Sequence, residues 1–487
     1  ASITGFKTLG DRSWALEYVL GGKKHTWNYR IEGAGKDTKY IFEFVDPDGT
    51  KKSETFTADS TYGSASRHSA LIAHPSRIRI TDSSIAGAPA PPSRHRHPSY
   101  RKNMIRDAET LNVLVDSVRR FVRERLVPRE AEVAETDMIP DDLREEMKAL
   151  GLFGLTIPEA YGGLGLTMEE EVMVMMALGR TSPAFRSTIG TNVGIGSGAI
   201  VIDGTEEQKR RYLPGLASGE RIGSFCLTEP GAGSDAASLR TTAVRDGDHY
   251  VLNGTKRYIT NANFASLFTV MARTDPANRG AGGISAFVVE RGTPGLSVGK
   301  PEKKMGQQGA HICDVIFENC RVPAGNLIGL REGVGFKTAM KTLDKGRLHI
   351  SAVAIGAAER MLADALAYAG ERKQFGQPIG DFQLVQAMLA DSQTEIYAAR
   401  TMLVDAAAKR DAGHDVTMEA SCCKLFATEM CGRVADRAVQ VFGGAGYVAD
   451  YGIERFYRDV RIFRLYEGTS QVQQLIIGRE LKRRGVM

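Results

Sequence analysis

The strongest constraint on the fold is a change of hydrophobic period along the chain. From about residue 105, apolar residues recur at the three-and-four spacing of helices, and this spacing dominates to about residue 220. Residues 221–340 instead hold short β-rich segments separated by Gly- and Asp-rich turns, and helical spacing returns after Gly335. The sequence therefore predicts an α+β multidomain protein, with a middle β domain between two helical domains.

The carboxyl-terminal part, 341–487, reads as a helical domain with an unusually apolar interior. Residues Ile350–Ala358 are apolar on nearly all sides, which indicates burial between helices or between subunits. A later helix is expected to face the core with residues at helical spacing, namely Val385, Leu389, Ile396, Ala399 and Leu403. A further helix is predicted over roughly 418–441, and an oligomer is expected.

The amino-terminal residues differ in character from the rest. Residues 14–20 and 40–45 alternate apolar and polar side chains, and Asp46–Gly49 supplies a turn for a hairpin over 39–58. We expect a small β module over 1–58. A Pro-, Ser- and Arg-rich linker over 59–104 follows it.

Bulk composition excludes several classes of protein. The chain has 487 residues and a formal charge of +5, with its Lys and Arg residues scattered, so a nucleic-acid surface is not expected. It contains no run of eighteen apolar residues, and we expect no segment that spans a membrane. The six Cys lack metal-site spacing and are expected to be reduced and packed, with no bound metal.

Two distant segments carry the chemistry. Glu467 stands among apolar and hydroxyl neighbours and is followed at once by Gly468, which suits a carboxylate that abstracts a proton. Upstream, Phe225–Asp235 joins a strand to a loop with two glycines, so that backbone N–H groups and the hydroxyls of Thr228 and Ser234 are donors for phosphate or flavin oxygens. Taken alone, such a loop is usually only a turn.

Three further segments support a ligand site. Tyr258–Asn261 ends a strand with an aromatic ring and a hydroxyl, and Arg372–Gly376 offers a cation for a pyrophosphate and the Phe375 ring for adenine. Gln440–Gly446 closes a helix with glycines that permit close backbone approach. In order and spacing, these segments and that of Glu467 resemble the acyl-CoA dehydrogenase family over about residues 105–487.

This resemblance implies a fold and a cofactor. It implies a helical domain over 105–220, a β-barrel-like middle domain over 221–340 and a four-helix-bundle carboxyl domain over 341–487, assembled as a homodimer or homotetramer with FAD at subunit interfaces. The implied flavin-facing residues are Phe225, Leu227, Thr228, Gly233, Ser234, Tyr258, Ile259 and Thr260. The residues implied to hold the pyrophosphate and adenosine, partly from a neighbouring subunit, are Arg372, Gln374, Phe375, Phe382, Gln383, Gln440, Gly443, Gly444, Thr469 and Gln471.

The resemblance also implies the roles of the substrate-binding residues. Ser234, Asp344, Arg347 and Gly468 would contact coenzyme A, although a salt bridge from Arg347 to a neighbouring helix is the alternative. Glu467 would be the catalytic base, with its own backbone N–H and a flavin ribityl hydroxyl stabilising the enolate oxygen. Some relatives carry their base at the position of Gly346, which cannot serve here.

The amino-acid sequence in the middle of the chain is similar to that of very-long-chain acyl-CoA dehydrogenases, notably in 205–209, 212–220 and 286–292. The glycines of 190–199 either leave room for a long acyl chain or allow close helix packing. We expect α,β-dehydrogenation of medium- to long-chain acyl-CoA to trans-2-enoyl-CoA in fatty-acid β-oxidation, with an electron-transfer flavoprotein as acceptor, in a bacterial cytoplasm or the mitochondrial matrix. The alternatives are an acyl-CoA oxidase and a catalytically silent scaffold or assembly protein.

Overall fold

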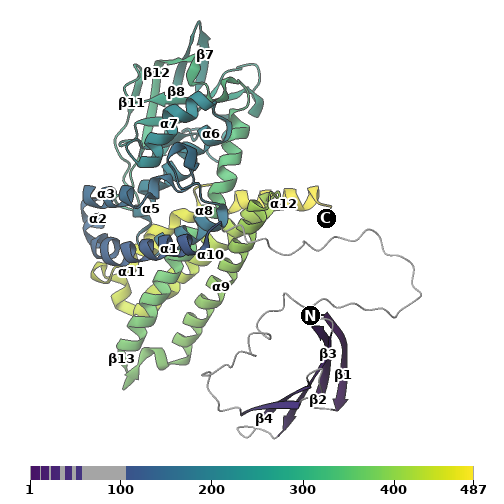
Figure 1. The fold of residues 1–487 in the computed structure, drawn as a ribbon. Coiled ribbons are helices and arrows are strands. Elements are labelled where there is room, and N and C mark those ends of the chain that lie inside the picture. The colour runs from purple at the N-terminus through teal and green to yellow at the C-terminus, as the bar shows by residue number, and fades with distance from the viewer. Residues whose placement is uncertain are drawn as a thin grey trace. The chain divides into compact units, whose positions relative to one another are not determined.

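The computed structural model describes residues 2–10, 13–20, 23–32, 39–45, 51–57 and 106–485 (Figure 1). The chain divides into two compact units, Ala1–Arg101 and Lys102–Met487.

The first unit contains a five-stranded sheet in which each strand is antiparallel to the next in chain order. Its strands are β1 (Ser2–Gly10), β2 (Ser13–Leu20), β3 (Lys23–Glu32), β4 (Lys39–Val45) and β5 (Lys51–Thr57). The pairing of β4 with β5 confirms the predicted hairpin strands, and Arg30 on β3 forms an ion pair with Glu43 on β4 at 3.2 Å. The predicted turn at 46–49 and the linker over 59–104 lie outside the described residues.

The second unit begins with helices, as the hydrophobic period predicted. They are α1 (Ala108–Phe121), α2 (Glu130–Thr136), α3 (Asp141–Ala149), α4 (Met168–Leu178), α5 (Pro183–Val193), α6 (Ile195–Asp203) and α7 (Glu206–Ser218). Local signals fix their starts: Thr167 and Glu170 form a reciprocal capping box at α4, and Ser182 caps α5 with Pro183 in its first turn.

A curled seven-stranded sheet follows the amino-terminal helices (Figure 1). Its strands are β6 (Gly223–Cys226), β7 (Thr242–Asp246), β8 (His249–Thr260), β9 (Leu267–Arg273), β10 (Ile284–Glu290), β11 (Leu296–Val298) and β12 (Ile312–Pro323). The strand order is β10-β9-β7-β8-β12-β11, with β6 parallel to β9. The β-rich segments expected within 221–340 are therefore confirmed as strands.

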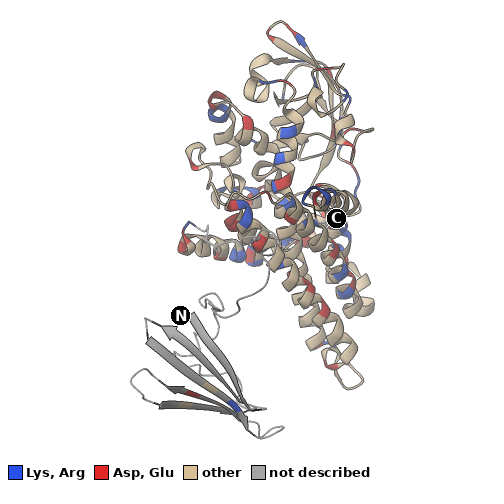
Figure 2. Ribbon diagram, turned by 90° about the vertical axis from the view of Figure 1, so that its right-hand side faces the viewer, with Lys and Arg blue, Asp and Glu red and all other residues tan. Residues whose placement is uncertain are grey.

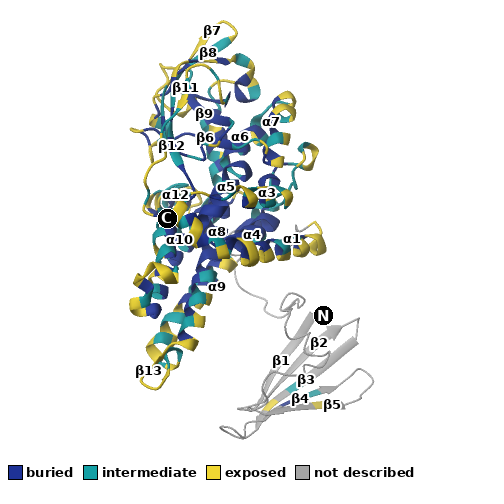
Figure 3. Ribbon diagram, turned by 90° about the vertical axis from the view of Figure 1, so that its left-hand side faces the viewer, coloured by how far each residue is buried: buried dark blue, intermediate teal, exposed yellow. Residues whose placement is uncertain are grey.

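The chain ends in long helices packed side by side (Figure 1). They are α8 (Gly335–Glu371), α9 (Gln383–Asp411), α10 (Thr417–Phe442), α11 (Ile453–Asp459) and α12 (Ser470–Arg483), and β13 (Lys373–Gln374) pairs with β14 (Gln377–Pro378) between α8 and α9. Residues Ile350–Ala358 are buried, as predicted, and Figure 3 shows that burial continues from α4 and α5 into the middle of α8.

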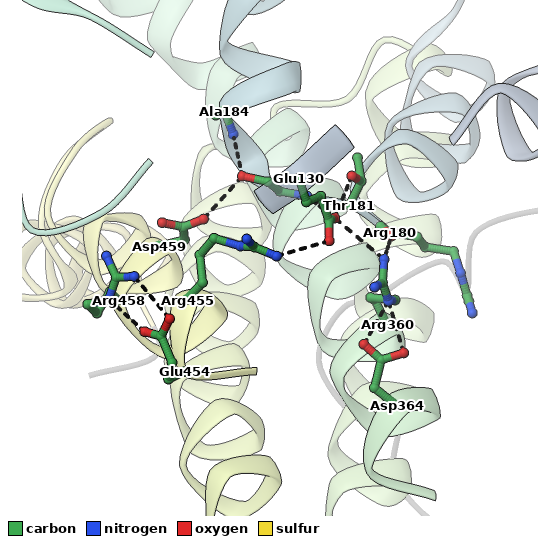
Figure 4. A network of polar contacts seen from close by, with 11 residues as sticks. Glu130, Arg180, Thr181, Ala184, Arg360, Asp364, Glu454, Arg455, Arg458 and Asp459 are labelled. Atoms are coloured by element: carbon green, nitrogen blue, oxygen red, sulfur yellow. Dashed lines mark hydrogen bonds and ion pairs between the residues drawn. The ribbon is translucent and has the colours of Figure 1, made fainter. Parts of the chain in front are cut away.

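A buried carboxylate joins the two helical domains (Figure 4). Glu130 on α2 accepts hydrogen bonds from the Thr181 hydroxyl at 2.6 Å and from the Ser182 N–H at 2.8 Å. Its oxygens also accept hydrogen bonds from the guanidinium groups of Arg360 on α8 at 3.5 Å and of Arg455 on α11 at 3.4 Å. Arg455 depends on this carboxylate more than Arg360 does, because Arg360 also pairs with Asp364 at 2.7 Å, whereas Glu130 is the one carboxylate paired with Arg455 among the described residues.

Asp459, at the end of α11, connects all three domains. Its carboxylate accepts from the Gln307 N–H at 2.5 Å and from the Ser182 hydroxyl at 3.1 Å. Burial raises the pKa of Asp459 to about 6. This contact fixes the segment that leads to Glu467 against the β domain.

Acidic and basic residues are interspersed along the helices of the second unit, which agrees with the small net charge (Figure 2). Across the described ranges, no helix combines the length and the apolar character that crossing a bilayer would require.

We predict that Glu130→Ala lowers the free energy of unfolding by about 3 kcal/mol, because it leaves the partly buried Arg455 without a paired carboxylate among the described residues and removes the acceptor of Thr181 and of the Ser182 N–H. Chemical denaturation measures the change. Glu135→Ala, at an exposed site on the same helix, is the control and is expected to change stability by less than about 0.5 kcal/mol. Equal stabilities of the two variants would contradict this account of the network.

Candidate active site

Glu467 occupies a strained turn just before α12. Its φ is 56°, in the left-handed region that residues other than glycine rarely adopt, and Gly468 follows with φ 86°. Two buried donors hold the turn: Lys424 Nζ donates to the Gly468 carbonyl at 2.6 Å, and Gln473 Nε2 donates to it at 3.0 Å. Strain retained by such contacts is typical of functional sites.

Glu467 is a half-buried residue whose carboxyl oxygen Oε2 is fully buried. Its Oε2 has no hydrogen-bond partner within the described part of the chain. Gly346 of α8 lies directly against it, since a Cβ on Gly346 would stand 3.1 Å from Glu467 Cδ and closer still to Oε2. The missing side chain at Gly346 therefore provides the space that the carboxyl group fills.

Burial and charge act in opposite directions on this group. Burial raises the pKa of Glu467 above its ordinary value, while the cations of Arg186 on α5, Lys424 on α10 and Arg347 on α8 limit the rise. The result is a carboxylate that is more basic than one in water and is still stabilised by nearby positive charge.

Arg186 is held in place by a buried chain of polar groups. Its Nε donates to His349 Nε2 at 2.8 Å, and His349 Nδ1 lies 2.7 Å from Glu171 Oε1. Because Arg can only donate, His349 must carry its proton on Nδ1 and donate it to Glu171. Burial lowers the pKa of His349 to about 4, so this ring is neutral at pH 7, and Lys345 completes the chain at 3.2 Å from Glu171.

Three of the four predicted coenzyme A residues, Asp344, Arg347 and Gly468, lie close to Gly346 or to the base along the chain. Arg347 pairs with Asp344 one turn away on the same helix at 2.5 Å, so it does not bridge to a neighbouring helix. Arg347 Nε is buried without a partner among the described residues. Gly468 adjoins the base, and Ser234 is exposed on its loop.

The predicted flavin-facing segments are brought together by the β domain. The Arg257 N–H donates to the Thr228 carbonyl at 2.8 Å, and the Ser224 hydroxyl donates to the Thr260 carbonyl at 2.7 Å. Tyr258 has φ 59° and its side chain is 57% exposed. Of the other members of this set, Phe225, Leu227 and Ile259 are buried, whereas Gly233 is exposed.

The end of β8 is fixed to the helix that faces the base. The amide of Asn261 donates to the Ser187 carbonyl and to the Thr191 hydroxyl of α5, both at 2.9 Å. Because α5 also carries Arg186, this one helix connects the end of β8 with the surroundings of Glu467.

Most of the remaining predicted FAD residues lie in a second cluster at the far end of α8, whereas Thr469 and Gln471 follow the base at the start of α12. Gln374 and Phe375 lie on the β13–β14 hairpin, just beyond the end of α8 (Figure 1). At a rise of 1.5 Å per residue, the last residue of α8 is roughly 38 Å along the helix from Gly346. The end of α10 joins this cluster, because Phe442 stacks on Tyr368 of α8 with ring centroids 4.2 Å apart. The predicted residues of the second cluster are Arg372, Gln374, Phe375, Phe382, Gln383, Gln440, Gly443 and Gly444.

Both clusters have features that suit a dinucleotide. A Cβ placed on Gly233, Gly443 or Gly444 would meet nothing within 4 Å, so ligand atoms can approach these backbones closely. Phe375 is 94% exposed and offers a ring for stacking. At the start of α12, Gln471 is exposed, whereas the hydroxyl of Thr469 already accepts the Val472 N–H at 3.2 Å. The open glycine backbones and the exposed aromatic ring therefore fit FAD.

The glycines of 190–199 do not enclose free space beside their own backbones. A Cβ on Gly190 would stand 2.9 Å from the Arg186 guanidinium carbon, and one on Gly198 would stand 2.7 Å from Thr342 Cγ2. Close packing accounts for these two glycines, so they give no support to a long acyl pocket.

Sequence reasoning did not identify Arg186, Lys424, His349 or Gln473. The sequence offered one indication of such residues, a charged or polar residue placed between apolar ones. Lys424, between Cys423 and Leu425, is an example.

Comparison with known families agrees with this geometry. Three family models match in succession: the acyl-CoA dehydrogenase N-terminal domain over 108–220, its middle domain over 224–320 and its C-terminal domain over 333–482. The matches cover nearly all of the second unit.

Individual relatives are similar over the same region. An acyl-CoA dehydrogenase of Bacillus subtilis is 42% identical over 75% of this chain and 96% of its own length, and a subunit of the caffeyl-CoA reductase–Etf complex of Acetobacterium woodii is 42% identical over 71% and 91%. The structure of butyryl-CoA dehydrogenase from Megasphaera elsdenii superposes with a TM-score of 0.75 at 37% identity, over 77% of this chain and 99% of that one. The chain therefore belongs to the acyl-CoA dehydrogenase family, and it is an FAD-dependent oxidoreductase.

Proposed function

We propose that this protein dehydrogenates acyl-CoA thioesters between the α- and β-carbons, with Glu467 as the base. The observation that carries the proposal is the buried Oε2 of Glu467, which has no partner among the described residues. A structural carboxylate would be expected to have its oxygens satisfied. An oxygen left free in a site of raised pKa is available to accept a proton from a ligand.

The chain's own groups account for the proton transfer. The Glu467 carboxylate takes the α-proton, and the acyl chain excludes water and makes the carboxylate still more basic. The N–H of Glu467 has no acceptor within the described residues, so it is free to donate to the thioester oxygen as negative charge develops there. FAD, when bound, supplies the acceptor for the hydride that leaves the β-carbon.

The two clusters of FAD residues support a cofactor site shared between subunits. In one chain, the second cluster lies beyond the end of α8, roughly 38 Å along that helix from Gly346 beside the base. We infer a homodimer or homotetramer in which Phe225, Leu227, Thr228, Gly233, Ser234, Tyr258, Ile259 and Thr260 face the flavin and the second cluster, with Thr469 and Gln471, holds the adenosine part. Ser234, Asp344, Arg347 and Gly468 would bind coenzyme A.

An electron-transfer flavoprotein is the proposed electron acceptor, supported by the relative that assembles with Etf. The main alternative is an acyl-CoA oxidase, which would release one hydrogen peroxide per turnover in air. A cytoplasmic or mitochondrial-matrix location and a role in β-oxidation stay predictions, as do the domain boundaries at residues 220 and 340.

Glu467→Gln is predicted to lower kcat by at least about 100-fold, because the amide cannot accept the α-proton. Its flavin absorbance and oligomer size should match those of the wild type. Glu318→Gln, at an exposed position of β12, is the control and should retain full activity. Dehydrogenation by Glu467→Gln at the wild-type rate would reject the assignment, and a flavin-loaded wild type that is silent with every acyl-CoA would favour the scaffold alternative.

Gly346→Ala is predicted to lower kcat/KM by at least about 10-fold, because the added methyl group occupies the space of the Glu467 carboxyl group. Gly370→Ala is a matched control on the same helix, since a Cβ there meets nothing within 4 Å. Steady-state kinetics compares the two variants, with flavin absorbance as the test of folding. Equal activities would show that Gly346 does not shape the site.

Activity with saturated acyl-CoAs of graded length is predicted to peak at medium to long chains. This expectation rests on the sequence similarity to very-long-chain acyl-CoA dehydrogenases. A structurally similar enzyme, that of Megasphaera elsdenii, is instead a butyryl-CoA dehydrogenase. Flavin bleaching under anaerobic conditions measures the preference without an electron acceptor. A maximum at four carbons would contradict the prediction.

A further inference from the structure

Lys424 is a buried cation with no carboxylate paired to it among the described residues. It lies on α10 with a fully buried side chain, and its Nζ donates to the Gly468 carbonyl at 2.6 Å. Burying an ammonium group costs several kcal/mol unless charge or hydrogen bonds compensate for it. One backbone carbonyl is weak compensation, so the residue requires an explanation.

We propose that Lys424 is a positioning residue for the base: its ammonium group locks the Glu467–Gly468 turn, and its charge keeps Glu467 ionised in a water-excluded site. This inference rests on the proposed function. It adds to that function a residue that contacts the base segment from α10 and acts through Glu467.

The hydrogen bond accounts for the geometry of the turn. Glu467 and Gly468 both have positive φ, and Lys424 and Gln473 are the two donors that reach the Gly468 carbonyl. Gln473 also donates to the Glu467 carbonyl at 3.3 Å, and it fills the space where a Gly468 side chain would stand, 2.6 Å from the Cβ position. The turn is therefore held from α10 and α12 together.

The charge of Lys424 acts on Glu467 without a paired carboxylate to offset it among the described residues. Three cations face the base, and their effect on its pKa decreases in the order Arg186, Lys424, Arg347. Arg347 is paired with Asp344, whereas Arg186 donates to the neutral His349 and Lys424 donates to a backbone carbonyl.

The groups that face Lys424 in turn are Glu467, Glu429 on its own helix and Arg347 on α8. Glu429 is paired with Arg464 at 3.2 Å and accepts from Ser470 at 2.6 Å. Burial lowers the pKa of Lys424 to about 8, against the opposing effect of the two carboxylates. Lys424 therefore carries its proton through the acidic and neutral range in which Glu467 must ionise.

A pair of variants separates charge from hydrogen bonding. Lys424→Gln retains an N–H donor but removes the positive charge. Lys424→Arg retains the N–H donor and the positive charge. Loss of the cation destabilises the carboxylate, so the acid limb of kcat/KM against pH should move upward by about one unit or more in Lys424→Gln. In Lys424→Arg it should stay near the wild-type position.

Two controls test the specificity of this shift. Gln473→Leu removes a donor to the same turn without changing charge, so it should lower kcat and leave the acid limb in place. Lys409→Met removes an exposed lysine of α9 that pairs with Asp405, and it should change neither kcat nor the limb. An unshifted limb in folded, flavin-loaded Lys424→Gln would overturn the inference.

A measurement on the native lysine covers the case in which Lys424 variants fail to fold. Selective ¹⁵N-lysine NMR follows the titration of Lys424 in the wild type and in Glu467→Gln. If the two groups interact, removing the Glu467 charge lowers the pKa of Lys424, and an unchanged value would reject the coupling. Failure of the proposed function is recognised separately, by wild-type turnover in Glu467→Gln.

Discussion

The site depends on the burial of one carboxyl group against a glycine. Glu467 fills the space beside Gly346, and within the described part of the chain its buried Oε2 has no hydrogen-bond partner, which costs free energy. The surrounding contacts are explained by that cost. A strained turn points the group inward, a lysine and a glutamine hold the turn, and three cations keep the charged form accessible.

The long helix α8 extends from the base to the exposed hairpin between α8 and α9. Its middle section is buried among α4, α9 and α10 and carries Gly346 and His349 beside the base. Its far end presents the exposed hairpin with Phe375. One long helix therefore separates Gly346, beside the base, from the hairpin.

Much of this arrangement could be predicted from the sequence, for physical reasons. The change from helical to strand-like period identified the layered domains, and the apolar run at 350–358 identified the buried part of α8. Glu467 could be found because its neighbours are apolar. The polar chain from Arg186 through His349 to Glu171 could not, because it joins residues up to 178 positions apart whose pairing depends on tertiary packing. The glycines near residue 190 were ambiguous for the same reason.

The most direct test of the central claim is the exchange of the acyl α-hydrogen with solvent. Flavin-loaded enzyme without an electron acceptor is mixed with acyl-CoA in D₂O, and NMR follows loss of the α-proton signal. The account predicts exchange by the wild type and a rate lower by at least about 100-fold in Glu467→Gln. Exchange at the same rate in both proteins would show that another group removes the proton.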